Sequence, residues 1–251
     1  MPTALETRAA LSLVTGAAVE ASLDLYHRLN GSPEQVRADL LDTVPALIDQ
    51  YGTASATLGA DAYDDAREQV GLGAYSTQLI IADRTETIRN AIAWAAHPLF
   101  DGVGSVESRL TGVVQPEVAR PFRDTVIGNR RTDPDCVGWQ RIAKGDACRF
   151  CLMLAGRGSV YKEATVNFAA HPHCDCTVQP VFYKREFIPG DGQGNRYYGS
   201  QGQSGRFVLR QTHVGPEATS MQYMASARAR TPEQRAALRA YLEKHFPDSP
   251  D

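Results

Sequence analysis

The segment SPEQVRADLLDTVPALIDQYG, residues 32–52, shows most clearly which kind of fold the first half of the chain adopts. Ser32 precedes a proline and stands three residues ahead of Gln35, which is the pattern of a capped helix N-terminus. Apolar residues then recur every three or four positions, as on the buried face of a helix: Val36, Leu40, Val44, Leu47 and Tyr51. We expect Gly52 to end this helix and Pro45 to kink it.

Similar signals extend the helical pattern on both sides of this segment. Thr3 and Glu6 have the spacing of a capping box, and the Ala- and Leu-rich stretch after them ends at Asn30. Further helices are predicted over residues 54–69 and from about residue 85 to residue 96. Residues 1–131 are therefore predicted to form a helical domain whose apolar stripes make its core. In this half, no group of His, Asp and Glu has the spacing of metal ligands or of an acid–base pair.

The sequence changes character after Arg131, and the fold class we predict is α+β. Strand patterns are expected over residues 137–143 and 177–183, and a small mixed α/β module resembling a zinc knuckle over residues 132–188. Residues 189–215 contain seven glycines and are predicted to form a flexible arm. Residues 216–251 are predicted to be a C-terminal helical segment, because a second Pro-Glu-Gln capping pattern follows Thr231.

Composition and charge limit the classes of protein that fit. The chain has 251 residues, a net charge of −3 and an isoelectric point near 6.1, which excludes a uniformly basic nucleic-acid coat. No uninterrupted apolar run approaches the ~20 residues of a membrane span, and no basic segment opens the chain, so we expect a soluble protein made in a cytosol. The net charge is −9 over residues 1–119 and +5 over residues 120–162. Either the two halves are simply solvated differently, or the second half faces nucleic acid or an acidic partner.

The arm is the best candidate for such a contact, because basic and aromatic residues alternate in it. A plain loop is the alternative to a contact with nucleic acid or with a neighbouring subunit. The candidate residues are Arg196, Tyr197, Tyr198, Arg206 and Arg210.

The strongest chemical signal is a cluster of cysteine and histidine between residues 148 and 176. Two thiols in the spacing C-x-x-C, followed by a His/Cys-rich group, suit a closed tetrahedral zinc site that would be structural. There are more candidate ligands than the four that such a site needs: Cys148, Cys151, His171, Cys174 and Cys176. A disulfide, a redox pair and coincidence remain open. A redox pair normally opens a helix after a strand and has no use for the second group.

The known catalytic zinc patterns are missing from the chain. It contains neither the H-x-E of the zinc deaminases nor H-E-x-x-H. A nucleophile pair of Cys151 with His171 remains open.

Residues 139–182 resemble the C-terminal signature of the Mu F-like minor head proteins of tailed bacteriophages. The resemblance rests on Asp146-Ala-Cys148-Arg-Phe-Cys151, a short Gly-containing link, His171-Pro-His-Cys174-Asp-Cys176, and Pro180-Val181. Asp175 departs from it, because the family often has Arg there. The helical half is similar to the corresponding region in phages of actinobacteria.

This resemblance implies a minor capsid protein of the virion head interior, present in the host cytoplasm during assembly. The implied role is head morphogenesis near the portal, with a part in DNA packaging or delivery. The implied partners are the portal protein, the major capsid protein and packaged DNA, with no membrane. The alternative is a capsid maturation protease or another hydrolase that uses the Cys/His cluster. We find no Ser–His–Asp or Ser–Lys arrangement, so we assign no catalytic residue and prefer the structural role.

Overall fold

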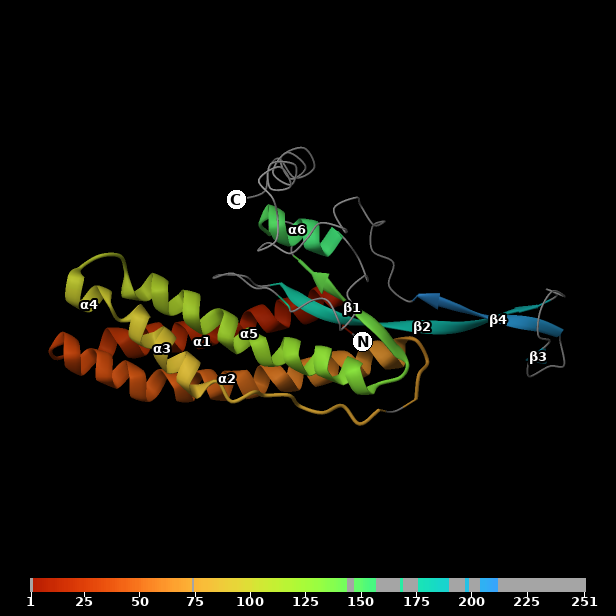
Figure 1. Cartoon of the computed structure of the whole chain (residues 1–251), viewed down its shortest axis with the longest axis horizontal. Helices are drawn as coiled ribbons and strands as arrows, with labels where there is room; N and C mark the ends of the chain where they lie inside the picture. Colours follow the sequence, from red (N-terminus) through yellow and green to blue (C-terminus); the bar gives the residue numbers. More distant parts are fainter. Residues whose placement is uncertain are drawn as a thin grey trace.

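The computed structural model describes residues 2–73, 75–143, 147–156, 168, 176–189, 197–198 and 204–211. Helices fill the first half of the chain, and antiparallel strands with one short helix follow, so the fold is α+β as predicted (Figure 1). The elements are α1 (Ala4–Arg28), α2 (Pro33–Gln69), α3 (Thr85–Ala95), α4 (Pro98–Asp101), α5 (Val106–Thr132), β1 (Cys136–Ile142), α6 (Arg149–Gly156), β2 (Thr177–Pro189), β3 (Tyr197–Tyr198) and β4 (Ser204–Gln211).

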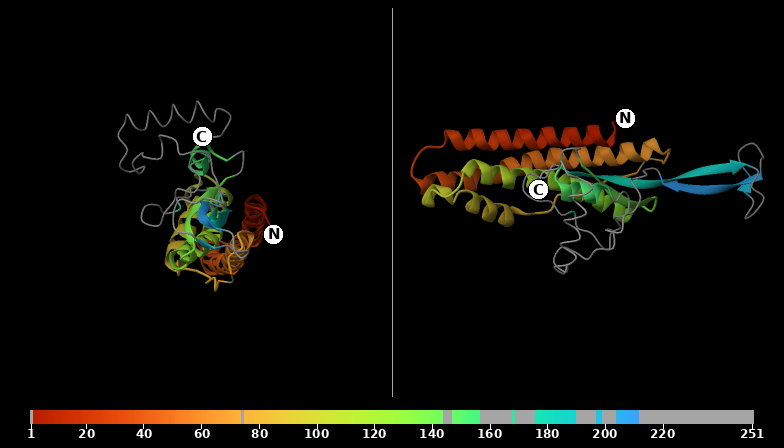
Figure 2. Two further views of the ribbon diagram at one scale, coloured as in Figure 1. Left: turned by 90° about the vertical axis from the view of Figure 1, so that its right-hand side faces the viewer. Right: turned by 90° about the horizontal axis from the view of Figure 1, so that it is seen from above.

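The three long helices α1, α2 and α5 lie side by side, and α3 packs against α2 and α5 (Figure 2). Both predicted capping boxes are present. The Glu6 N–H donates to Thr3 Oγ1 at 3.2 Å and the Thr3 N–H donates to Glu6 Oε2 at 2.6 Å. Ser32 and Gln35 are bonded in the same reciprocal way at the start of α2. The orphan N–H groups at these two helix ends are thus satisfied locally.

The prediction that Gly52 ends a helix is wrong. One helix, α2, runs from Pro33 to Gln69 and includes the segment predicted as a separate helix over residues 54–69. Gly52 is buried, and a Cβ at this position would lie 3.4 Å from Pro121 Cγ on α5. The glycine therefore serves a helix–helix contact, and burial of the surrounding apolar face compensates for its low helix propensity.

The helices and the first two strands share a hydrophobic core. One buried cluster lies within the helices and contains Leu40, Ile92 and Leu110. A second cluster joins Tyr63 and Phe122 of the helices to Trp139 of β1 and Phe182 of β2. The strands predicted as part of the 132–188 module therefore pack directly on the helical half.

Helix α1 is long and apolar enough to cross a membrane by length and composition alone. It has 25 residues, and an 18-residue window within it has a mean hydropathy of 1.2. Core helices and N-terminal signal segments meet the same criterion. Leu11 and Ala18 are buried against the bundle, whereas Leu5 and Leu13 are 61% and 75% exposed. α1 thus contributes to the core on one side and presents apolar side chains on the other.

The strands form an antiparallel sheet in the order β1-β2-β4-β3. β1 pairs with the first part of β2, from Ile142 opposite Thr177 to Cys136 opposite Phe182. The two predicted strands are confirmed, but β2 continues to Pro189, beyond its expected end at residue 183. Figures 1 and 2 show this outer part of β2 extending past the end of the helical bundle together with β4.

Within residues 189–215, predicted as a flexible arm, the structure contains two strands, β3 and β4, that the sequence analysis did not expect. The outer part of β2 offers a row of backbone donors and acceptors, and β4 contains the strand-favouring run Phe207-Val208-Leu209. Backbone pairing over this length outweighs the entropy cost of the nearby glycines. The other residues of the arm, and the predicted C-terminal helical segment 216–251, lie outside the described residues.

Candidate functional site

Three of the five predicted metal ligands come together in the structure. Cys148 and Cys151 lie at the start of α6, and Cys176 lies directly before β2. Cys151 and Cys176 are buried in one small cluster, against which Cys148 and Phe168 pack. The other two predicted ligands, His171 and Cys174, lie outside the described residues.

The C-x-x-C pair has the geometry of a capped helix N-terminus. The Cys151 N–H donates to Cys148 Sγ at 3.5 Å, and the Leu152 N–H donates to the Cys148 carbonyl oxygen at 3.0 Å. An N–H···S bond and the positive end of a helix both favour a thiolate over a thiol. A thiolate is the form of cysteine that binds zinc and also the form that attacks an electrophile.

This placement removes one argument that the sequence offered against a redox pair. Such a pair normally opens a helix after a strand, and here β1 precedes the pair and α6 begins at Arg149. A dithiol redox reaction needs two sulfur atoms, whereas a tetrahedral metal site needs three or four protein donors. No disulfide joins the four described cysteines, Cys136, Cys148, Cys151 and Cys176, to one another.

The described part of the chain contains only a portion of the donor set that a zinc site requires. Within residues 2–143 and the later described segments, no three His, Cys, Asp or Glu side chains form a metal-binding group. A tetrahedral zinc site at Cys148, Cys151 and Cys176 would need one further donor, an imidazole or another thiolate.

Two arginines that the sequence did not single out surround the cluster. Arg123 of α5 is buried and donates from Nε and Nη2 to the Cys176 carbonyl oxygen, at 3.1 and 2.7 Å. The Arg123 and Arg141 guanidinium carbons lie 4.4 and 3.8 Å from the centroid of the Phe168 ring. Both cations therefore stack on an aromatic ring that packs against the cysteines.

Cys136 is separate from this cluster. It packs with Tyr63, Trp139 and Phe182, and its Sγ donates to the Gly138 carbonyl oxygen at 3.3 Å. Burial raises the pKa of the Cys136 thiol, so it stays protonated and unreactive at neutral pH. It is therefore a structural cysteine and provides an internal control for experiments on the others.

Four of the five predicted nucleic-acid or partner contacts lie in the outer part of the sheet. Tyr197 and Tyr198 form β3, and Arg206 and Arg210 belong to β4. Arg196 lies outside the described residues. These four residues therefore lie on two strands, β3 and β4, that pair with each other in the outer part of the sheet.

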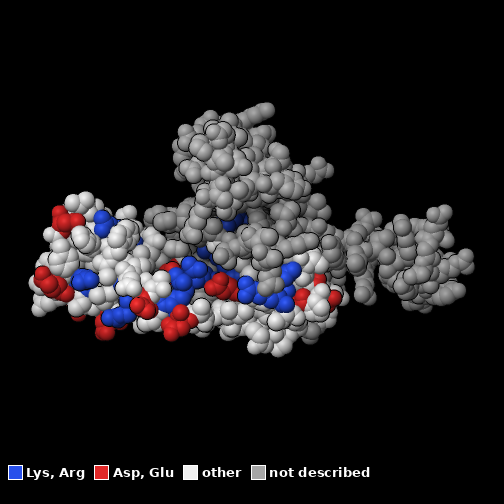
Figure 3. Space-filling model, in the orientation of Figure 1, with Lys and Arg blue, Asp and Glu red and all other residues white. Residues whose placement is uncertain are grey.

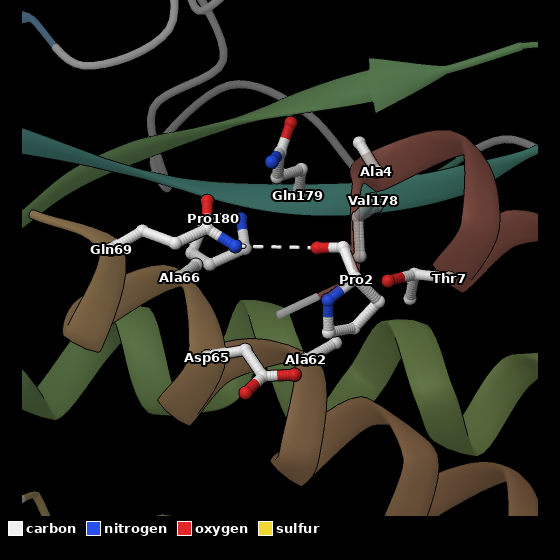
Figure 4. A pocket seen from close by; sticks show the side chains of 10 residues that line it. All are labelled: Pro2, Ala4, Thr7, Ala62, Asp65, Ala66, Gln69, Val178, Gln179 and Pro180. Carbon is white, nitrogen blue, oxygen red and sulfur yellow. Dashed lines mark hydrogen bonds between the residues drawn. The ribbon is translucent and has the colours of Figure 1, made fainter.

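Two hollows among the described residues are small, whereas two larger and more open depressions, of about 510 and 400 Å³, lie at the start of α3 and beside Arg67 and Tyr75. One of the small hollows lies between the start of α1, the end of α2 and β2, where Gln69 Nε2 donates to the Pro2 carbonyl oxygen at 3.2 Å (Figure 4). It and a second hollow, between α2, α3 and α5, each have a volume of about 20 Å³. That is room for about one water molecule. Neither is lined by a cysteine, so neither provides a substrate pocket for the cluster.

Charges of both signs alternate over the described surface of the bundle on the face shown in Figure 3. Among the described ion pairs, Arg84 Nε lies 2.8 Å from Glu117 Oε2, and Arg120 Nε lies 3.5 Å from the same oxygen. On this face, the acidic excess of the first half does not form a single acidic patch.

A comparison with protein families identifies the group to which the chain belongs. The model of a family described as VG15 protein matches residues 2–198, which include α1 through β3. No curated protein and no solved structure matches. Since the family match covers well over half of the chain, this is a member of the VG15 protein family, a family of phage gene products.

Proposed function

We propose that this VG15-family protein is a minor structural protein of the phage head that acts in head morphogenesis near the portal. The observation that carries the proposal is the clustering of Cys148, Cys151 and Cys176. These residues belong to the pattern by which the chain resembles the Mu F-like minor head proteins. Membership of the VG15 family supports the part of the proposal that makes this a phage protein.

The helical bundle suits the protein–protein contacts that such a role needs. Several large apolar side chains are exposed on it, among them Leu13 on α1 and Trp94 at the end of α3. Exposed apolar side chains on long helices are a common feature of partner-binding surfaces. We propose that the bundle binds the portal protein or the major capsid protein.

We further propose that the cysteine cluster holds a structural zinc ion. Cys148, Cys151 and Cys176 would be ligands, with Cys174 or His171 completing the set. A site with four protein ligands stabilises the fold and leaves no position for a substrate. Arg123 would fix the Cys176 backbone to α5, so that the module and the bundle keep one relative position.

The zinc proposal predicts stoichiometric metal in the purified protein. Elemental analysis should find about one zinc per chain, and Cys151→Ser should lose most of it, because a hydroxyl is a poor zinc ligand. Cys136→Ala is the matched control, since Cys136 is also a buried thiol but lies outside the cluster. It should keep the metal. A wild-type protein without zinc, or equal retention by both variants, would contradict the proposal.

An enzyme is the second proposal, and the position of Cys148 supports it. This thiol is only partly buried and lies at a helix N-terminus, as a nucleophilic cysteine would. Alkylation with iodoacetamide across a range of pH from acid to mildly alkaline separates the two proposals. A zinc site protects all clustered thiols equally, whereas a hydrolase or redox enzyme has one thiol that reacts with a depressed pKa.

The location in the virion tests the function itself. Mass spectrometry of purified heads, separated from tails, should detect the chain at a copy number far below that of the major capsid protein. Deleting residues 4–69, which form α1 and α2, should abolish its incorporation. Absence of the chain from heads and procapsids would overturn the proposed function.

A further inference from the structure

The rest of the described structure covers only part of the apolar surface of α1. The 18-residue window of this helix has a mean hydropathy of 1.2, and 22% of that window is buried. Figure 2 shows α1, in red, at the outside of the bundle, where it packs against α2 and α5. A helix with so little charge is normally covered all round, by protein or by lipid. The outer side of α1 is therefore left uncovered by the described part of the chain.

The side of α1 that faces the bundle is, by contrast, rich in polar side chains. Arg8, Thr15 and Ser22 are 8%, 3% and 0% exposed. Thr15 Oγ1 donates to the Ser12 carbonyl oxygen at 3.1 Å, and Ser22 Oγ donates to the Ala18 carbonyl oxygen at 2.8 Å. Both hydroxyls are thus satisfied within the helix itself. A surface helix usually directs its polar residues outward, so the distribution in α1 is partly reversed.

The exposed residues of α1 follow the spacing of a seam between two helices. Glu6, Ala9, Leu13, Gly16 and Glu20 are all exposed and alternate in steps of three and four residues. We call these five residues the outer face of α1. Leu13, at its centre, is 75% exposed, and a Cβ at Gly16 would have no neighbour within 4 Å. Between the two glutamates the outer face is uncharged, so it offers one large apolar side chain beside small residues that allow close approach.

We infer that the outer face of α1 binds an α-helix of another head protein, one whose apolar side lies between two basic residues. The inference rests on the proposed function, and it names the surface and the kind of partner. The charges at the two ends select this partner. Glu6 and Glu20 are about 21 Å apart at the rise of an α-helix. Lysine or arginine at the same separation on the partner helix would pair with both carboxylates while its apolar side covers Leu13.

A second copy of this chain is a poorer occupant of the outer face. Two α1 helices packed antiparallel about Leu13 would place Glu6 of each opposite Glu20 of the other, and a parallel pair would place each glutamate beside its equivalent. Both arrangements bring carboxylates together, which is unfavourable.

A membrane is a poorer occupant for a related reason. A span needs ~20 consecutive residues, and every such stretch within Ala4–Arg28 contains Glu20. A carboxylate in the hydrocarbon region is costly. The packing of α1 against α2 and α5 also leaves only one of its sides free for lipid.

Leu13→Glu tests the inference, because it places a carboxylate at the centre of the outer face and removes no buried side chain. Targeted mass spectrometry of purified heads should find roughly tenfold less of this variant than of the wild type, since a carboxylate without a partner is costly at the centre of an interface. Glu20→Lys should lower incorporation by about threefold or more, because it sets a cation against the partner's basic residue. Circular dichroism of the purified variants should show the helix content of the wild type, since both positions are exposed.

Leu79→Glu and Asp42→Lys are the matched controls, because they make the same kinds of change at exposed positions outside α1. Leu79, on the connection between α2 and α3, is 50% exposed. Both controls should enter heads within about twofold of the wild type. Equal losses in the controls, or unchanged incorporation of either test variant, would overturn the inference and leave the proposed function standing. Absence of the wild-type chain from heads would overturn the proposed function and the inference with it.

Measurements on the purified full chain separate the other two occupants. Light scattering should show no dimer that Leu13→Glu dissolves, and the chain should not float with vesicles of phosphatidylcholine and phosphatidylglycerol. A dimer or vesicle binding that Leu13→Glu abolishes would overturn the inference, because a second copy or a membrane would then cover the outer face of α1.

Discussion

Asp133→Ala is expected to lower the free energy of unfolding by about 3–5 kcal/mol, the usual cost of leaving a buried charge without its partner. The Asp133 side chain is fully buried at the junction of α5 and β1. It forms an ion pair with Arg67 of α2 and accepts a hydrogen bond from Tyr63 Oη at 2.9 Å. Its removal leaves the Arg67 cation in the interior and the Tyr63 hydroxyl without its acceptor.

Arg67 has no easy route to solvent once Asp133 is gone. Its side chain is 7% exposed, and its guanidinium donates to the Gly73 carbonyl oxygen at 3.2 and 3.3 Å. The same group lies 5.0 Å from the centroid of the Tyr75 ring and 5.7 Å from that of Phe182. These contacts hold the cation in place between the helices and β2. The cation therefore stays in the interior without its buried carboxylate, with only the Gly73 carbonyl oxygen and the half-exposed Asp135 as remaining polar partners.

Urea denaturation followed by circular dichroism at neutral pH measures the effect. Asp135→Ala is the matched control, because Asp135 also faces Arg67, at 3.5 Å, but its side chain is 50% exposed. An exposed pair contributes at most about 1 kcal/mol. If the two substitutions lowered stability by similar small amounts, the buried network would not be the link between bundle and sheet that its geometry indicates.

The sequence predicted the helices well where the signals are local. Capping boxes at Thr3 and Ser32, and apolar residues at helical spacing, depend only on neighbours within one or two turns. Arg67 could not be assigned in this way. It lies in an acidic stretch that includes Asp61 and Glu68, both exposed, so the sequence suggests a solvated face. Its partner Asp133 is 66 residues away, and no local pattern connects the two.

In the candidate site, too, the residues with a local sequence signal were predicted, and those positioned by distant contacts were missed. The C-x-x-C spacing indicated Cys148 and Cys151 directly, and the structure places Cys176 beside them. Arg123 had no signal, because an arginine in an amphipathic helix is usually exposed. The pairing of β4 with β2 was missed for a related reason. Glycines near residues 190–205 favour a loop locally, whereas the ladder that overrides them is formed with a distant segment.

Two helical glycines show how packing against a distant segment can reverse the effect that helix propensity predicts. Replacing each of them with alanine tests this. Gly16 is on the exposed side of α1, and a Cβ there would have no neighbour within 4 Å. Gly59 is buried in α2, and a Cβ there would lie 2.8 Å from the Phe122 carbonyl oxygen and 3.1 Å from Phe122 Cα. Both positions are helical, so helix propensity alone predicts the same gain from alanine at each.

We expect the two substitutions to have opposite signs. Gly16→Ala should raise the free energy of unfolding by about 0.5–1 kcal/mol, because alanine loses less backbone entropy in a helix. Gly59→Ala should lower it by about 1–3 kcal/mol, because the atoms that it meets are backbone atoms of α5 and cannot rotate away. Thermal and urea unfolding of both variants beside the wild type provide the measurement. A gain at both positions would mean that α2 and α5 are not in the close contact on which the bundle, and the attachment of the cysteine cluster through Arg123, depends.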